Sequence, residues 1–333
     1  MGLASSQQTV VRGGPAVIPC RYGAAMTTPV KSVGTPVSVG APGAVPPAVS
    51  PSSLASFRSC PLKFYFSYAA GWRTRPTEHT VIGNVTHRAV ELLYKEAPAA
   101  RTRAAATAHL RTSAAAERAR PDVARLLGAD RTLDATVEER CEHMLDGLFS
   151  LEDPTQVQVR PGDCEAWVQA RLYGAEVRGR IDRMTGVAAG VWRISDYKTG
   201  KPAKPAFIET ALFGLFTYAA TLAASEPNRR LPDEVELLYL RERVRVNRPV
   251  VRDYLLAHAK TVGRTWRGIN AAHTSRTWEA RVSPLCKFCE FAPGCPLKAR
   301  GAIPAVGTVE HDDLLIGIGL IRRTPRAVGG PTS

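Results

Sequence analysis

Two short stretches with strand-like patterns, separated by a turn, constrain the fold of this chain more than any other feature. Residues 176–184 and 191–198 have the composition and length of β-strands, and the short segment between them favours a hairpin. Side chains alternate along a strand, so Asp196 and Lys198 point to one face, and Asp182 on the neighbouring strand can reach it. The sequence therefore predicts a sheet that gathers two carboxylates and an amine.

The chemistry of these three side chains suits phosphodiester hydrolysis. Two convergent carboxylates, Asp182 and Asp196, form with a peptide carbonyl the all-oxygen site that Mg²⁺ or Mn²⁺ prefers. Such an ion neutralises a phosphate and acidifies a bound water, and Lys198 beside it can orient that water. On its own, Asp-x-Lys usually marks a solvated strand face, so its significance rests on the hairpin around it.

The remaining pattern predicts a mixed α/β fold. Helical periodicity precedes the hairpin, and an apolar helix followed by another strand comes after it. The expected helices lie at 52–70, 80–96, within 101–127, 133–151, 205–224 and 250–269. The expected strands lie at 157–159, 165–172, 176–184, 191–198 and 234–240. We therefore expect a central mixed sheet flanked by helices, with a helical insertion.

The two ends of the chain differ from the middle. Residues 1–50 are rich in Pro, Gly, Ser, Thr and Val, lack acidic residues and show no helical periodicity, which predicts disorder. Residues 300–333 are expected to be mostly loose, although 314–321 has the composition of a strand. The folded domain is therefore placed at 51–299.

Three thiols lie close together near the end of this predicted domain, at Cys286, Cys289 and Cys295. This spacing is typical of metal ligands, but zinc and iron–sulfur centres usually take four thiolates. Cys60, far upstream, is the obvious fourth ligand for a centre built on segment 284–298. Either metal would have a structural role, because it would close a loop of more than 200 residues.

The charge balance favours a polyanionic partner. The net charge is +14, which points to nucleic acid before membrane. Half of this excess precedes the first acidic residue, Glu78, so a basic tail would account for part of it. No apolar stretch is long enough to span a bilayer, and the start carries no secretory signal. Seven cysteines, an odd number, argue against disulfides, so we expect a cytoplasmic compartment.

Four motifs follow one another along the chain. They are Cys-Pro-x-x-Phe at 60–64, Gly-x-x-x-His at 83–87, Gly-Arg-Ile-Asp-Arg at 179–183 and Asp-Tyr-Lys-Thr-Gly at 196–200. Together they resemble the PD-(D/E)xK nuclease superfamily, specifically its RecB-like exonuclease branch. The resemblance implies a restriction-endonuclease-like core with an iron–sulfur-stapled C-terminal segment.

The resemblance also implies roles for individual residues. His87, Asp182 and Asp196 would bind Mg²⁺ or Mn²⁺, and Lys198 would assist the attacking water. In this branch a helix carries Gln-x-x-x-Tyr facing the site and the DNA. Tyr218 matches the tyrosine and would be a catalytic-site residue, but the glutamine position is Gly214, which puts the substrate contacts in doubt.

The cysteines also have a counterpart in this branch, where some members hold a 4Fe–4S cluster with one cysteine before the nuclease core and three after it. The implied cluster ligands here are Cys60, Cys286, Cys289 and Cys295. The residues alone leave structural zinc as an alternative.

These observations predict a metal-dependent DNA exonuclease that acts on single strands or duplex ends in repair, recombination or processing. No P-loop sequence occurs, so the chain is nearer to compact CRISPR-associated, phage-type and AddB-like nuclease modules than to helicase–nucleases. A separate helicase or recombination protein is a candidate partner, and no membrane association is expected. The alternatives are a catalytically weak DNA-binding scaffold and a zinc-stabilised nucleic-acid-binding protein. Polarity, exo- or endonucleolytic action and preference for DNA over RNA stay open.

Overall fold

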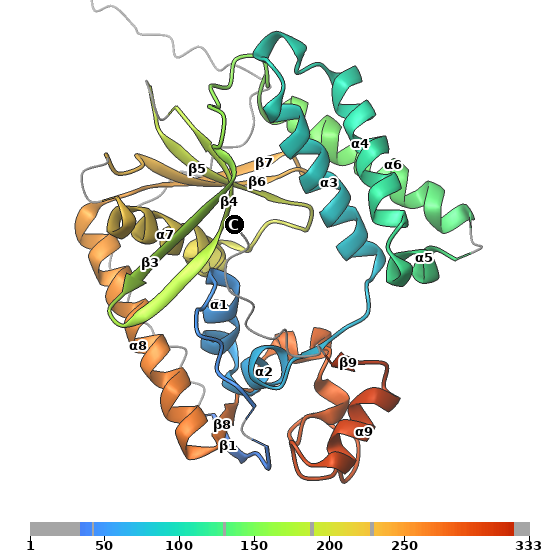
Figure 1. The fold of residues 1–333 in the computed structure, drawn as a ribbon, viewed down its shortest axis with the longest axis vertical. Helices are drawn as coiled ribbons and strands as arrows, with labels where there is room; N and C mark the ends of the chain where they lie inside the picture. The colour runs from blue at the N-terminus through green and yellow to red at the C-terminus, as the bar shows by residue number, and fades with distance from the viewer. Residues whose placement is uncertain (1–33, 42, 129–130, 187–189, 227–229, 323–333) are drawn as a thin grey trace, which may run out of the picture.

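A five-stranded mixed sheet forms the centre of the fold (Figure 1). The structure is a computed structural model that describes residues 34–41, 43–128, 131–186, 190–226 and 230–322. The strands lie in the order β3 (Cys164–Leu172), β4 (Ala175–Thr185), β5 (Arg193–Lys198), β6 (Glu234–Tyr239) and β7 (Val244–Pro249). Strands β5 and β6 are parallel, and the other neighbours are antiparallel. The predicted mixed α/β architecture is confirmed.

Strands β4 and β5 form the predicted antiparallel pair. Arg183 lies opposite Ser195 and Met184 opposite Ile194. The pairing of β3 with β4 continues well beyond this point, so the two strands form a long hairpin that extends past β5 (Figure 1). The strand predicted at 157–159 was wrong, because these described residues form none. Strand β7 had not been predicted at all.

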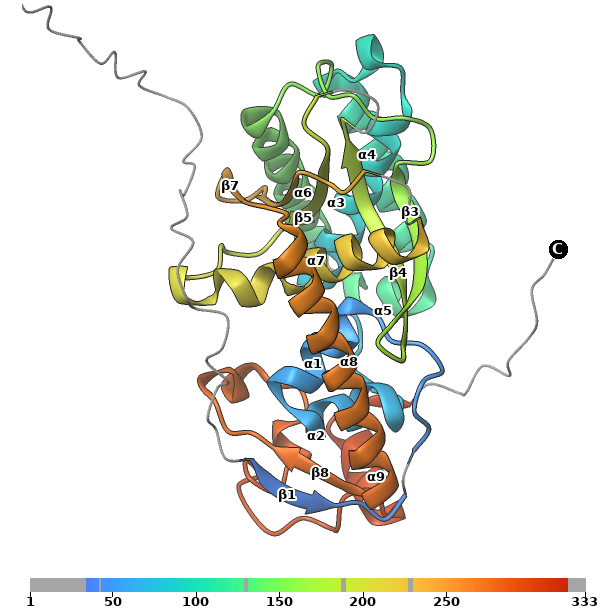
Figure 2. The same cartoon turned by 90° about the vertical axis from the view of Figure 1, so that its left-hand side faces the viewer.

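Helix α7 (Ile208–Ser225) is the crossover that parallel β5 and β6 require. It packs against β3 and β6 on one side and against α8 (Arg252–Ser275) on the other (Figure 2). Among the described residues, only the segment Pro205–Ser225 is long and apolar enough to cross a membrane, and 56% of its apolar window is buried. Packing on both sides accounts for its apolar composition.

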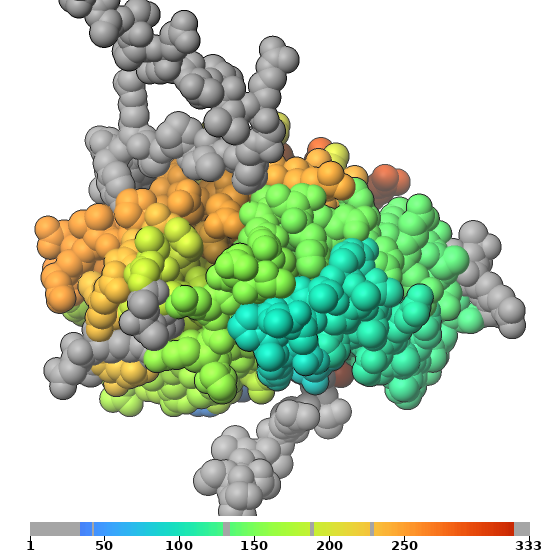
Figure 3. Space-filling view, turned by 90° about the horizontal axis from the view of Figure 1, so that it is seen from above, coloured from blue at the N-terminus to red at the C-terminus, as the bar shows by residue number. Residues whose placement is uncertain are grey.

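Four helices form a lobe against the opposite face of the sheet. They are α3 (Glu78–Lys95), α4 (Arg103–Arg118), α5 (Pro121–Leu127) and α6 (Arg131–Leu151). The lobe has its own apolar core, which Tyr197 of β5 and Leu238 of β6 join to the sheet. Seen from above, the lobe adjoins the light-green surface of the strand region (Figure 3). This lobe is the helical insertion that the sequence predicts.

Helix α6 approaches the end of β6 so closely that only glycine fits at position 147. A Cβ on Gly147 would lie 1.8 Å from the carbonyl oxygen of Leu240. We expect Gly147→Ala to lower the free energy of unfolding by about 1–3 kcal/mol, because helix and strand must move apart. Urea denaturation of the variant and the wild type measures this loss.

The matched control is Gly214→Ala on α7, where the new Cβ would lie at an ordinary 3.5 Å from Cβ of Pro51. Removing a helical glycine without a clash should raise the free energy of unfolding by up to about 1 kcal/mol. Equal losses in the two variants would contradict the close approach at Gly147.

The N-terminal segment corrects the prediction of disorder over 1–50. Strand β1 (Thr35–Ser38) pairs antiparallel with β8 (Thr277–Ala280). Val37 and Val49 are buried in the main core, and Val49 also forms a bridge with Val177 of β4. A partner strand from the far end of the sequence orders this stretch, which no local pattern reveals. Residues 1–33 lie outside the described part of the chain.

The C-terminal segment corrects the prediction of a mostly loose tail over 300–333. Helix α9 (Val309–Gly317) buries His311 and Leu315, and β9 (Ile321–Arg322) pairs with β2 (Trp72–Arg73). The strand predicted at 314–321 is therefore wrong, because most of these residues belong to α9 and its end. Residues 323–333 lie outside the described part.

The opening helix predicted at 52–70 consists of three pieces. Helix α1 (Pro51–Ser59) begins at the N-cap Ser50, α2 covers Pro61–Phe64, and a π-helical turn covers Tyr65–Ala69. Between α1 and α2, Cys60 is extended, with φ −156° and ψ 109°. A residue before proline disfavours the helical conformation, so Pro61 accounts for the break. The break turns the Cys60 thiol out of the helix.

Candidate active site and cysteine cluster

The carboxylates of Asp182 on β4 and Asp196 on β5 lie close enough to shift each other's pKa. Asp182 Oδ2 also accepts the Tyr197 backbone N–H at 3.0 Å and lies 3.2 Å from His87 Nδ1 on α3. Asp196 forms an ion pair with Lys198, two residues further along the same strand face. The structure thus brings together four of the five residues that the sequence predicts for the catalytic centre, and the fifth is Tyr218.

Burial dominates the electrostatics of this group. It raises the pKa of Asp196 to about 6, an effect that Lys198 opposes and Asp182 strengthens. Burial also acts to raise the pKa of Asp182, but the hydrogen bond and charge of His87 outweigh it and lower that pKa. The pKa of His87 is raised in turn, because Asp182 overcomes the opposite effect of burial. Two half-buried carboxylates this close to one another favour a bound cation.

The donor set fits a hard divalent cation, since it consists of two carboxylates and one imidazole. Within the described ranges, however, no three His, Cys, Asp or Glu side chains are grouped so that they could hold a metal ion. Asp182 instead pairs with His87, and Asp196 pairs with Lys198. The residues that would hold such an ion are His87, Asp182 and Asp196.

Glycines in two of the motifs bring helices close to the site. A Cβ on Gly83 of α3 would lie 3.8 Å from Oγ1 of Thr199, which follows Lys198. On β4, a Cβ on Gly179 would lie 2.8 Å from Cε1 of Tyr218, so a larger residue would displace that ring. Burial raises the pKa of Tyr218, and the charges of Asp182 and then Asp196 add to the shift. Tyr218 therefore lies beside the carboxylates, whereas Gly214 faces Pro51 of α1.

Glu165 on β3 is a third carboxylate near the site, and the sequence analysis did not identify it. The register of β3 and β4 places it opposite Asp182, and its backbone has φ 52°. Burial raises the pKa of Glu165, with further contributions from Asp182 and then Glu91. The positive φ of a non-glycine residue marks strain that functional sites often carry. Glu91 itself pairs with Arg88 and Lys95.

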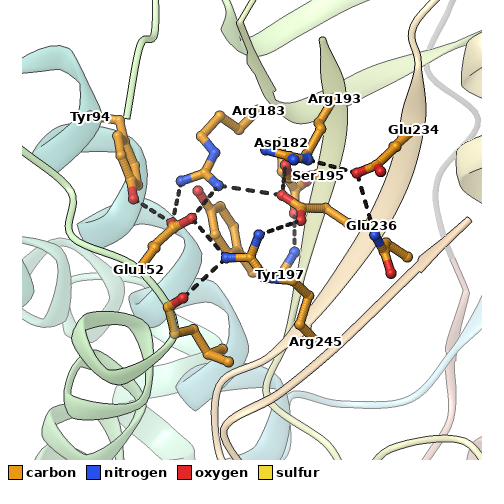
Figure 4. Close-up of polar contacts among 12 residues, drawn as sticks. Tyr94, Glu152, Asp182, Arg183, Arg193, Ser195, Tyr197, Glu234, Glu236 and Arg245 are labelled. Atoms are coloured by element: carbon orange, nitrogen blue, oxygen red, sulfur yellow. Dashed lines mark hydrogen bonds and ion pairs between the residues drawn. The ribbon is translucent and has the colours of Figure 1, made fainter. Parts of the chain in front are cut away.

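A buried network of charged residues supports the site from behind (Figure 4). Arg183, next to Asp182, donates to both oxygens of Glu152, and its guanidinium lies over the ring of Tyr94 on α3. Glu236 of β6 accepts from Ser195 at 2.6 Å and from Arg245 at 3.0 Å. The network joins the sheet to the helical lobe that carries His87. The sequence shows an arginine directly after Asp182, but it does not indicate which residues this arginine contacts.

The four predicted cysteine ligands line one cavity between α2 and the segment after β8. Backbone N–H groups point at their sulfurs. Arg281 donates to Cys60 Sγ at 3.5 Å and Ser283 to Cys286 Sγ at 3.3 Å. Cys289 and Cys295 also accept from backbone N–H groups, and burial raises the pKa of both thiols. In the metal-free protein burial keeps Cys289 and Cys295 as neutral thiols, and the backbone donors beside Cys60 and Cys286 would stabilise thiolates once a metal is bound.

Comparison with family models shows which family the chain belongs to. The family model of the PD-(D/E)XK nuclease superfamily matches residues 48–296. No curated protein matches the chain. Among solved structures, the chain resembles a protein from Eubacterium rectale that is provisionally named an exonuclease, with 11% identity and a TM-score of 0.46. That match covers 80% of this chain and 92% of the other. The family match spans most of the chain, and the chain belongs to the PD-(D/E)XK nuclease superfamily.

Proposed function

We propose that this protein is a metal-dependent DNA exonuclease that hydrolyses single-stranded DNA or duplex ends. The observation that carries the proposal is the meeting of Asp182, Asp196, Lys198 and His87 at one place, on β4, β5 and α3. Membership of the nuclease superfamily supports hydrolysis of phosphodiester bonds as the reaction class. The positive net charge of +14 fits a nucleic-acid substrate.

Each residue has a role that follows from its chemistry. Asp182, Asp196 and His87 would hold Mg²⁺ or Mn²⁺, which when bound supplies a Lewis acid for the phosphate and an acidified water. Lys198 would orient the attacking water and offset the negative charge that builds up on the phosphate. Tyr218 would position the substrate, because its ring is seated on Gly179 beside the carboxylates.

The proposal is tested with end-labelled DNA in the presence of Mg²⁺ or Mn²⁺. We expect an open single strand and an open duplex end to be shortened step by step, and end-blocked circles to resist. Chelation of the metal should stop the reaction. Cleavage of circles at the same rate would contradict exonuclease action, and no cleavage of any substrate would contradict the function.

A second candidate function is a catalytically weak DNA-binding scaffold that keeps the nuclease fold. Gly214 favours it, because this position on α7 carries no side chain with which to contact a substrate. The assay above separates the two functions, since the scaffold would bind labelled DNA without shortening it. As an exonuclease, the protein would act in the cytoplasm with a separate helicase or recombination protein in DNA repair or processing.

We also propose that Cys60, Cys286, Cys289 and Cys295 hold a 4Fe–4S cluster, with structural zinc as the alternative. The N–H donors directed at these sulfurs support thiolate ligation. A metal here would tie the junction of α1 and α2 to the segment after β8, so its role would be structural.

Cys60→Ser is expected to abolish cluster binding, because three thiolates remain where four are needed. After anaerobic purification, the wild type should be brown with about four iron atoms per chain, and the variant should be nearly colourless. Cys164→Ser, which alters a half-buried thiol on β3, is the control that should keep its iron. A colourless wild type holding one zinc would refute the cluster and favour the zinc alternative.

A further inference from the structure

The β3–β4 hairpin has one exposed face that carries an aromatic ring and arginines. Trp167 on β3 is 57% exposed and lies opposite Arg180 on β4. The next pair on this face is Gln169 opposite Arg178, and these side chains are exposed as well. We call these four residues, Trp167, Gln169, Arg178 and Arg180, the hairpin face. The residues that alternate with them, such as Val177, are buried toward the main core.

The hairpin face is continuous with the candidate active site. Side chains alternate along β4, so Arg178 and Arg180 point to the same side of the strand as Asp182. Arg180 Nη1 lies 3.9 Å from the carboxylate of Glu165. Glu165 therefore connects the Arg180 end of the hairpin face to Asp182. From Asp182 to Arg178 the strand covers about 13 Å at ~3.3 Å per residue. A chain lying along this face would therefore lead directly to the carboxylates.

The guanidinium groups of the two arginines on the hairpin face are free to contact a ligand. Within the described residues, the Arg178 side chain makes no hydrogen bond or ion pair, and Arg180 makes only the long contact with Glu165. Arg171, further along the hairpin, pairs instead with Glu176. Unpaired arginines next to an exposed indole form the combination that binds a single strand, with phosphates at the cations and a base stacked on the ring.

We propose that the hairpin face binds a single strand of nucleic acid and guides it to Asp182. A base stacks on Trp167, and Arg178 and Arg180 contact the phosphates. A flat aromatic ring needs an unpaired base, so the face selects single strands over duplex. This inference rests on the proposed nuclease function for its catalytic end, but the binding itself does not depend on hydrolysis.

Binding is measured by the fluorescence anisotropy of labelled oligothymidylate, with Ca²⁺ in place of Mg²⁺ to prevent turnover. Trp167→Ala should weaken binding about 5- to 100-fold, the loss of one stacked base, and Trp167→Phe should restore most of it. Arg178→Ala should reduce the slope of log K against log salt by about 0.7, the value for one phosphate contact on a single strand. A hairpin duplex should bind more weakly to the wild type and lose little in Trp167→Ala.

Two controls match these variants in exposure. Phe288→Ala removes a ring that is 75% exposed on the cysteine segment, and Arg125→Ala removes an exposed arginine on α5. Both should bind like the wild type. Thermal midpoints equal to that of the wild type confirm that each variant is folded, and the salt slope of Arg178→Ala gives a reading independent of the tryptophan.

The outcomes separate this inference from the proposed function. If the wild type degrades DNA but Trp167→Ala and Arg178→Ala bind like the wild type, the hairpin face is overturned and the nuclease stands. If the wild type degrades nothing but both variants lose affinity, the nuclease fails and the hairpin face stands. Equal losses in the controls, or an equal loss of duplex binding, would also overturn the inference.

Discussion

Asp196→Asn is expected to lower the rate of metal-dependent DNA hydrolysis by about 10³-fold or more, because it removes a carboxylate from the proposed metal site. The variant keeps the shape of the side chain and loses the charge that would bind the cation. Lys198→Ala should lower the rate of hydrolysis by about 10²- to 10³-fold, because it removes the ammonium group that would stabilise the transition state. Initial rates on a labelled single strand with Mn²⁺ measure both effects.

The same substitution should have the opposite effect on the stability of the metal-free protein. The pKa of Asp196 is about 6 in the folded chain, above the ordinary value of 3.8. A raised folded pKa contributes stability below the unfolded pKa, and this contribution is lost as pH rises through about 6. At pH 8 the ionised Asp196 therefore costs stability, and Asp196→Asn should melt at an equal or higher temperature.

The metal distinguishes this account from a general loss of structure. Mn²⁺ should raise the melting temperature of the wild type, because only the folded state binds it, and should raise that of Asp196→Asn much less. Asp313→Asn, at an exposed position on α9, is the control that should keep both the activity and the metal response. Wild-type activity in Asp196→Asn would place the chemistry elsewhere.

Local sequence was enough to predict the centre of the site. Asp182, Asp196 and Lys198 lie on two strands joined by one short turn, so alternation and strand pairing alone bring them together. The position of His87 came from a family motif, and the structure places it 3.2 Å from Asp182. Zinc and iron–sulfur centres usually take four thiolates, so the three C-terminal cysteines predicted a fourth ligand, Cys60. The structure places all four cysteines around one cavity.

Features that depend on pairing between distant segments could not be predicted. The ordering of β1 depends on β8, which lies at the far end of the sequence. Glu165 reaches the site because of its register with β4 and its positive φ, and neither has a local signal. The partners of Arg183 are Glu152, directly after α6, and Glu236 of β6, and the choice among distant acids is decided by tertiary packing.

Arg183→Met is expected to lower the free energy of unfolding by about 3–5 kcal/mol, the usual effect of removing one partner from a buried ion pair. The Arg183 side chain is 1% exposed and lies between Glu152 and Glu236. Without it, two carboxylates stay buried, and Arg245 is the one cation among the described residues that still pairs with them. Arg193→Met is the matched control, since the pair of Arg193 with Glu234 is half-exposed and should contribute at most about 1 kcal/mol.

A double variant identifies charge, rather than volume, as the cause of this loss. Glu152→Gln in the background of Arg183→Met removes one of the stranded charges and should recover part of the stability, which gives a coupling energy of about 1–3 kcal/mol in urea denaturation. Glu152 also accepts the hydroxyl of Tyr94 on α3, so the network links the helix of His87 to the strand of Asp182. Arg183→Met should therefore weaken Mn²⁺ binding as well as stability, whereas Arg193→Met should not. Equal losses in the two arginine variants would show that the buried charges do not hold the lobe against the sheet.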